Sequence, residues 1–168
     1  PDLLNIQTLL DAWKDTDKED LALIHVIRMS LRDQLLAPEG YAEARRIIAD
    51  AKDKQVVDRL LEVSLGAKQA DSARFVAENL GARRGSDIRS LELAAHAVRY
   101  AAADQLATVA ELLLPKDSDS PGDSAARLRS AQKAFQERGA PLPPAVRESA
   151  VKLATALLGQ EPHRQTQG

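Results

Sequence analysis

The 168-residue chain contains no cysteine, which excludes disulfides, thiolate metal sites and covalent haem attachment within it. Aromatic residues make up only 3% of the sequence, too few for a base-stacking surface. No uncharged apolar run approaches the roughly 18–20 residues that a membrane-spanning helix needs. The formal net charge is −2, so the sequence predicts no strong attraction to nucleic acid or to an anionic membrane.

The residues that are present indicate a helical protein. Apolar residues make up 44% and charged residues 29%, an ordinary globular balance. Helical periodicity recurs along the chain, and the two-residue alternation of a strand never persists. We therefore predict an all-α fold of about nine helices. They are expected at about residues 3–14, 19–37, 41–51, 55–65, 69–80, 87–102, 104–114, 124–138 and 145–158.

Turn-forming residues separate these helices. Residues 37–40 (Ala-Pro-Glu-Gly) end the second helix, Gly139 ends the eighth, and residues 115–123 form the clearest loop. Asp2 and Ser86 are candidate N-caps of the first and sixth helices. Short turns between helices of this kind are typical of stacked antiparallel helix pairs.

The apolar positions at helical spacing predict which side chains form the interior. The expected core is Leu9, Leu23, Ile27, Leu31, Ile47, Val57, Leu61, Val76, Leu91, Val98, Leu106, Leu113, Leu128, Val151 and Leu157.

Two segments of the sequence match at an offset of 71 residues. Residues 25–35 read HVIRMSLRDQL and residues 96–106 read HAVRYAAADQL. Half of this offset is about the size of one helix hairpin, and such self-similarity is typical of an α-solenoid. We therefore predict a single helical-repeat domain at residues 1–159, with halves at about 1–81 and 82–159, followed by a polar tail at 160–168. The match pairs His25 with His96, Arg28 with Arg99, Asp33 with Asp104, Gln34 with Gln105 and Leu35 with Leu106.

The pattern resembles HEAT-like repeats, in which the second helix of each pair often carries an Arg among small and aliphatic residues. Residues 20–35 (DLALIHVIRMSLRDQL) are also similar to the helical-repeat region of large exported haem-binding proteins of planctomycetes and verrucomicrobia. Those proteins combine a dehydrogenase-like propeller, a HEAT-like stretch and a c-type cytochrome domain. The resemblance implies a right-handed array of stacked hairpins and a periplasmic or exported location. It transfers no catalytic residue, because the haem-attachment motif Cys-x-x-Cys-His is absent here.

The matched polar residues allow two interpretations. His25, Arg28 and Arg32 share one side of a helix, so stacked repeats could form an anion or carboxylate site. Alternatively, the His or Arg bonds a turn carbonyl or pairs with an Asp of its own repeat, because each repeat must solve the same packing problem. We favour this structural role for the six candidates, which are His25, Arg28, Asp33, His96, Arg99 and Asp104.

Other chemistries lack the residues they need. His25 and His96 have no second His or Cys at helical spacing, and the loop at 117–123 starts like a calcium loop. Pro121 and Leu128 stand where its fifth and twelfth positions require oxygen ligands, so a solvated linker is predicted. There is no Gly-x-Ser-x-Gly elbow and no glycine-rich phosphate loop. We expect no metal and no cofactor.

These observations predict a non-catalytic helical-repeat module that docks a protein partner or spaces neighbouring domains of its own chain. We expect a monomer that binds no nucleic acid. The start at Pro1 and the polar end also lead us to expect part of a longer protein. Two alternatives stay open. One is an accessory domain of an exported haem-containing oxidoreductase, and the other is a HEAT-like nucleic-acid enzyme, which would need a basic concave face.

Overall fold

The computed structural model describes residues 5–51, 53–80, 88–115 and 119–158. Regular structure within these residues is helical throughout, which confirms the predicted all-α class. They form nine α-helices and one short 3-10 helix. The bounds are α1 Ile6–Asp15, α2 Leu21–Leu36, α3 Gly40–Asp50, α4 Lys54–Ser64, α5 Ala70–Leu80, α6 Ile88–Tyr100, η1 Ala103–Gln105, α7 Leu106–Leu112, α8 Pro121–Arg138 and α9 Pro144–Leu158.

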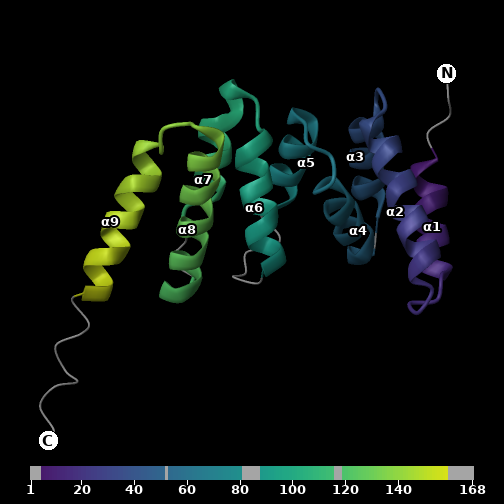
Figure 1. Cartoon of the computed structure of the whole chain (residues 1–168), viewed down its shortest axis with the longest axis horizontal. Helices are drawn as coiled ribbons and strands as arrows, with labels where there is room; N and C mark the ends of the chain where they lie inside the picture. Colours follow the sequence, from purple (N-terminus) through teal and green to yellow (C-terminus); the bar gives the residue numbers. More distant parts are fainter. Residues whose placement is uncertain (1–4, 52, 81–87, 116–118, 159–168) are drawn as a thin grey trace, which may run out of the picture.

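The helices stand side by side in one elongated row, with α1 and α2 at one end and α9 at the other (Figure 1). Each helix makes its main contacts with helices one or two places away along the chain. The odd-numbered helices contact one another in succession from α1 to α9, while α2 contacts α4 and α6 contacts α8. The row therefore has two layers, and consecutive helices alternate between them.

Polar side chains cap the starts of three helices. Asp20 Oδ1 accepts the backbone N–H of Leu23 at 3.0 Å, and Asp53 Oδ1 accepts that of Gln55 at 2.8 Å. Ser120 Oγ accepts the backbone N–H of Asp123 at 3.1 Å, so α8 begins at Pro121 and not at the predicted residue 124. The reason is that proline suits the first turn of a helix, where its missing N–H has no partner to lose.

The other helices begin and end within three residues of the predicted bounds. One predicted helix in the middle of the chain is interrupted. A continuous helix was expected at residues 104–114, whereas a 3-10 turn occupies Ala103–Gln105 and α7 ends at Leu112. The predicted caps Asp2 and Ser86, the boundary at residues 81–82 and the tail at 160–168 lie outside the described residues.

The turn between α2 and α3 depends on Gly40. A Cβ atom at this position would lie 2.3 Å from the carbonyl oxygen of Gln34 and 2.7 Å from that of Leu35. Glu39, immediately before it, has a positive φ of 67°. The chain therefore passes so close to the end of α2 that only glycine fits.

The core runs along the row between the two layers. Its largest fully buried side chains include Phe75, Phe135, Leu31 and Leu60. Of the predicted core, Leu9, Ile47, Val57, Leu91 and Leu106 are only partly buried. Three predictions are wrong, because Leu23, Val151 and Leu157 are exposed. All three lie on α2 or α9, where no further described helix covers the outer side.

Candidate functional site

The two matched histidines lie in different environments. His25 is exposed on α2, whereas His96 on α6 is only 3% exposed. α6 packs between α5 and α8, while the outer side of α2 has no described helix against it. The same sequence position therefore holds a surface residue in one copy of the match and a core residue in the other.

His96 belongs to a chain of buried polar groups that joins four helices. Its Nε2 lies 2.8 Å from the hydroxyl of Ser72 on α5, and that hydroxyl donates to the carbonyl of Ser64 on α4 at 2.8 Å. The hydroxyl of Tyr41 on α3 donates to Ser64 Oγ at 3.4 Å, and Ser64 Oγ donates to the carbonyl of Leu60 at 2.7 Å. Because the Ser72 proton is directed to Ser64, His96 must donate through Nε2–H.

Burial, and then the positive charge of Arg99, lower the pKa of His96 to about 4. The ring also packs against Tyr100, with centroids 4.8 Å apart. His96 is therefore neutral near pH 7, in agreement with a single N–H donated to Ser72. Burial likewise raises the pKa of the Tyr41 hydroxyl, which stays protonated as a donor.

A serine bonded to a histidine is also the start of a nucleophile–base pair. The surroundings of Ser72 and His96 differ from such a pair in three ways. The serine proton is already donated to a carbonyl, no described carboxylate bonds the other ring nitrogen, and neither residue lines any of the grooves described for this structure. Ser72 and His96 are both buried, and the arrangement can hold α4, α5 and α6 together.

The matched arginines both form ion pairs with a glutamate of the next even-numbered helix. Arg28 on α2 lies 2.8 Å from Glu62 on α4, and Arg99 on α6 pairs with Glu137 on α8. Glu62 also forms an ion pair with Arg89 of α6, at 2.5 Å. The ion pairs thus join α2 to α4, α4 to α6 and α6 to α8 along one layer.

One alternative from the sequence was that the matched aspartates pair with these arginines, and the structure places the aspartates elsewhere. Asp33 is exposed and pairs with its neighbour Arg32 at 2.8 Å. Asp104 is exposed in the 3-10 turn and forms no ion pair with a described residue. Sequence spacing pointed to partners within one helix, whereas the actual partners, Glu62 and Glu137, become neighbours only when the helices stack.

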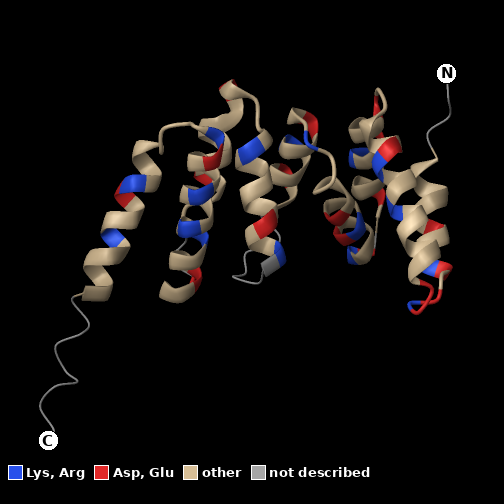
Figure 2. Cartoon of the chain, viewed as in Figure 1, with Lys and Arg blue, Asp and Glu red and all other residues tan. Residues whose placement is uncertain are grey.

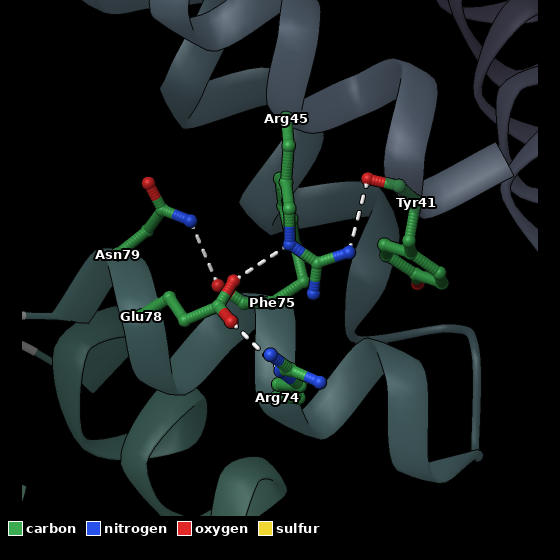
Figure 3. A network of polar contacts seen from close by, with 6 residues as sticks. All are labelled: Tyr41, Arg45, Arg74, Phe75, Glu78 and Asn79. Carbon is green, nitrogen blue, oxygen red and sulfur yellow. Dashed lines mark hydrogen bonds and ion pairs between the residues drawn. The ribbon is translucent and has the colours of Figure 1, made fainter. Parts of the chain in front are cut away.

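A second polar network ties together α3 and α5 in the other layer (Figure 3). Glu78 accepts from Arg45 at 2.8 Å and from Arg74 at 2.9 Å. Arg45 also donates to the carbonyl of Tyr41 at 3.3 Å and lies over the ring of Phe75. Burial alone would raise the pKa of Glu78, but the hydrogen bonds from the two arginines outweigh it and lower that pKa.

The sequence analysis did not predict this network, because its residues come from two different helices. The signal that could have found it is the recurrence of Arg and Glu at positions that face between helices. Arg46 does stay on the surface and pairs with Glu43 of its own helix at 2.5 Å.

Among the described residues, three grooves lie along the odd-numbered helices. The groove between α1, α3 and α4 has a volume of about 610 Å³ and that between α5 and α7 about 360 Å³. The third, of about 850 Å³, runs along the exposed side of α9 and reaches Leu114. Charges of both signs line the first, where Asp11, Glu43, Asp50 and Asp53 face Lys14, Arg46 and Arg59. A surface of this mixed kind suits a peptide or protein better than a phosphate backbone.

The described residues of the segment 117–123, which was predicted to be a solvated linker, form contacts within the chain. Asp119 forms a buried ion pair with Arg127 at 2.6 Å, and Ser120 Oγ donates to Asp123 Oδ2 at 2.8 Å. Residues 117–118 lie outside the described residues. No group of three potential metal ligands occurs within the described ranges.

None of the helices that the structure describes is both long and apolar enough to cross a lipid bilayer. Comparison of the chain with protein-family models, with curated proteins and with solved structures finds no match.

Proposed function

We propose that this chain is a non-catalytic helical-repeat module, a HEAT-like α-solenoid that serves as a protein-interaction scaffold or as a spacer within a larger protein. The observation that carries the proposal is the contact pattern, in which helices pack mainly on those one or two places away. In a solenoid each helix pair buries its apolar face on its neighbours, and the long outer surface remains free for partners.

The use of polar side chains supports a structural module. Catalysis requires polar groups that converge in an accessible cavity with shifted pKa values. Here the most strongly shifted group, His96, is buried between helices, and Glu78 is a fully bonded carboxylate. The grooves of the odd-numbered layer remain as the surface where a protein partner would bind.

A fluorophosphonate probe tests the non-catalytic part of the proposal, because it labels serines that a base activates. We expect no labelling of Ser72. Labelling that disappears in Ser72→Ala and His96→Gln, with the helical circular-dichroism spectrum retained, would show an active dyad and overturn the proposal.

A distance measurement between the two ends tests the spacer. Because the chain has no cysteine, Thr8→Cys on α1 and Arg147→Cys on α9 can be spin-labelled without background. A rigid array predicts one narrow distance distribution in double electron–electron resonance, as narrow as that of the neighbouring control pair Thr8→Cys and Ala49→Cys. A distribution several times broader than the control would contradict a rigid spacer.

A charge reversal tests the scaffold. Asp50→Lys changes the groove between α1, α3 and α4, while Asp104→Lys makes the same change in the exposed 3-10 turn. A partner that uses this groove should be retained by the native chain and by Asp104→Lys and lost by Asp50→Lys. Equal binding to all three would exclude this groove as the docking surface.

A further inference from the structure

Exposed large apolar side chains are confined to the two ends of the row. Among the described residues, all that are exposed lie on α2 or α9, and none lies on α1 or on α3–α8. These two helices stand at opposite ends of the molecule (Figure 1). Apolar exposure in separate patches of this kind marks surfaces that bind another protein. The exposed side chains are Leu21, Leu23, Val26, Met29, Leu36, Val151, Leu157 and Leu158.

On α2 the exposed residues form a second apolar stripe. Its buried side carries Ile27, Leu31 and Leu35, whereas Val26 and Met29 recur on the outer side with exposed fractions of 58% and 37%. In the first two turns of α2, only Ile24 and Ile27 are even partly buried. The other apolar side chains of these turns are therefore exposed over a broad surface. His25 lies within this stripe.

The same end of the molecule is acidic. Four carboxylates lie at the end of α1 and in the turn before α2, and none forms an ion pair with a described residue. This acidic turn is red in Figure 2. Over residues 6–36, six acidic side chains oppose four basic ones, a net charge of −2. The four carboxylates are those of Asp15, Asp17, Glu19 and Asp20.

The α9 end of the molecule also combines an exposed apolar stripe with charge, but its net charge is positive. Val146 is buried and Leu153 partly buried on its inner side, while Val151, Ala154 and Leu158 form an exposed stripe at helical spacing. Arg147, Glu148 and Lys152 are also exposed on α9, and none forms an ion pair with a described residue, so the helix itself has a net charge of +1. Over residues 119–158, six basic side chains oppose four acidic ones, a net charge of +2.

We propose that the α9 end of one molecule binds the α1–α2 end of a second copy, so that molecules associate head to tail. Both ends are apolar at the centre, and their charges are opposite in sign, which favours contact between them over contact between like ends. The two ends lie too far apart in one molecule to meet, so the contact forms between copies (Figure 1). Head-to-tail association differs from the monomer that the sequence led us to expect, because a sequence does not reveal which side of a helix stays uncovered.

A head-to-tail contact is heterologous, and it continues into a chain of molecules unless its geometry closes a ring. The area offered by one or two helices is at the low end of specific interfaces, so we expect dissociation constants of about 10–500 µM. Because charge contributes, association should weaken when salt is raised to about 1 M.

Sedimentation velocity over a concentration series tests the proposal with two substitutions at exposed positions. Val26→Glu blocks the α2 stripe, and Val151→Glu blocks the α9 stripe. Each variant alone should associate at least about tenfold more weakly than the native chain. An equimolar mixture should form a dimer and stop there, because one variant keeps the α9 face and the other keeps the α2 face. Ala70→Glu, exposed in the centre of the row, is the matched control and should associate like the native chain.

Three results would overturn the proposal. A native chain that stays at the mass of one molecule throughout the series would show that another segment or another protein covers these faces. Loss of association in only one of the two variants would indicate contact between like ends. Association unchanged in both would place the contact elsewhere. The distance measurement between spin labels does not depend on these results, because it is made at concentrations below association.

Discussion

His96 carries the largest pKa shift among the described residues, and it determines how the protein responds to mild acid. Its pKa in the folded chain is about 4, below the ordinary value of 6.5. Above pH 6.5 the ring is neutral in both the folded and the unfolded state, so stability is fully present. As the pH falls toward 4, the unfolded chain takes up a proton that the folded chain does not, and stability is lost.

The first prediction is a loss of about 2 kcal/mol in the free energy of unfolding between about pH 7.5 and pH 5. Urea unfolding at the two pH values measures it. His96→Gln should flatten the pH dependence, whereas His25→Gln, at an exposed position, should leave it unchanged. A pH dependence that survives in His96→Gln would assign the effect to another group.

The second prediction concerns the ion pairs between stacked helices. Arg28 is 44% exposed, so solvent screens its pair with Glu62, and Arg28→Ala should cost at most about 1 kcal/mol. Arg99→Ala should also lower the melting temperature, as Arg28→Ala should. Thermal unfolding measures both. An unchanged melting temperature in both variants would show that these arginines do not hold the stack together and are free for binding.

At the scale of the element, glycines at two helix starts have opposite roles. Gly40 lies against the backbone of α2, whereas Gly122 in the first turn of α8 has only Ser120 Oγ within 4 Å, at 3.8 Å.

The third prediction therefore compares two identical changes. Gly40→Ala should destabilise the protein by about 1–3 kcal/mol or more, because its methyl group overlaps backbone atoms that cannot move aside. Gly122→Ala should stabilise it by about 0.5–1 kcal/mol, because alanine favours a helix. Chemical denaturation measures both, and two changes of the same sign would contradict the geometry at Gly40.

The helices themselves could be predicted from sequence, because apolar periodicity and turn residues are local signals. The start of α8 was missed because proline was taken only as a loop residue. The sequence could not predict that His25 is exposed and His96 is buried, since burial depends on whether another helix packs against the outer side of the helix that carries the histidine. The Ser72–His96 link and the Arg45–Glu78 pair were missed for a related reason, because their partners come together only in the stacked molecule.

At the scale of the whole molecule, burial is greatest in the middle of the row and least at α9. Residues 93–98 of α6 are all buried, whereas α9 buries only Val146. A helix that buries little apolar surface opens at a lower cost in free energy.

The fourth prediction is that native-state hydrogen exchange is slowest in α5 and α6 and fastest in α9. The gradient should follow position along the row, because each helix is held mainly by near neighbours. Exchange rates measured helix by helix check this. Equal protection from α1 to α9 would indicate that the array opens as a single cooperative unit.

The same dependence on near neighbours determines the mechanical behaviour of the molecule. A force applied between α1 and α9 acts on the helix interfaces in series, so every interface bears the full load and their small extensions add together. The molecule should therefore lengthen as a soft spring through slight tilts at many interfaces before any helix unfolds. If α9 is pulled away, the remaining helices keep their own neighbours and provide the surface on which it packs again after release.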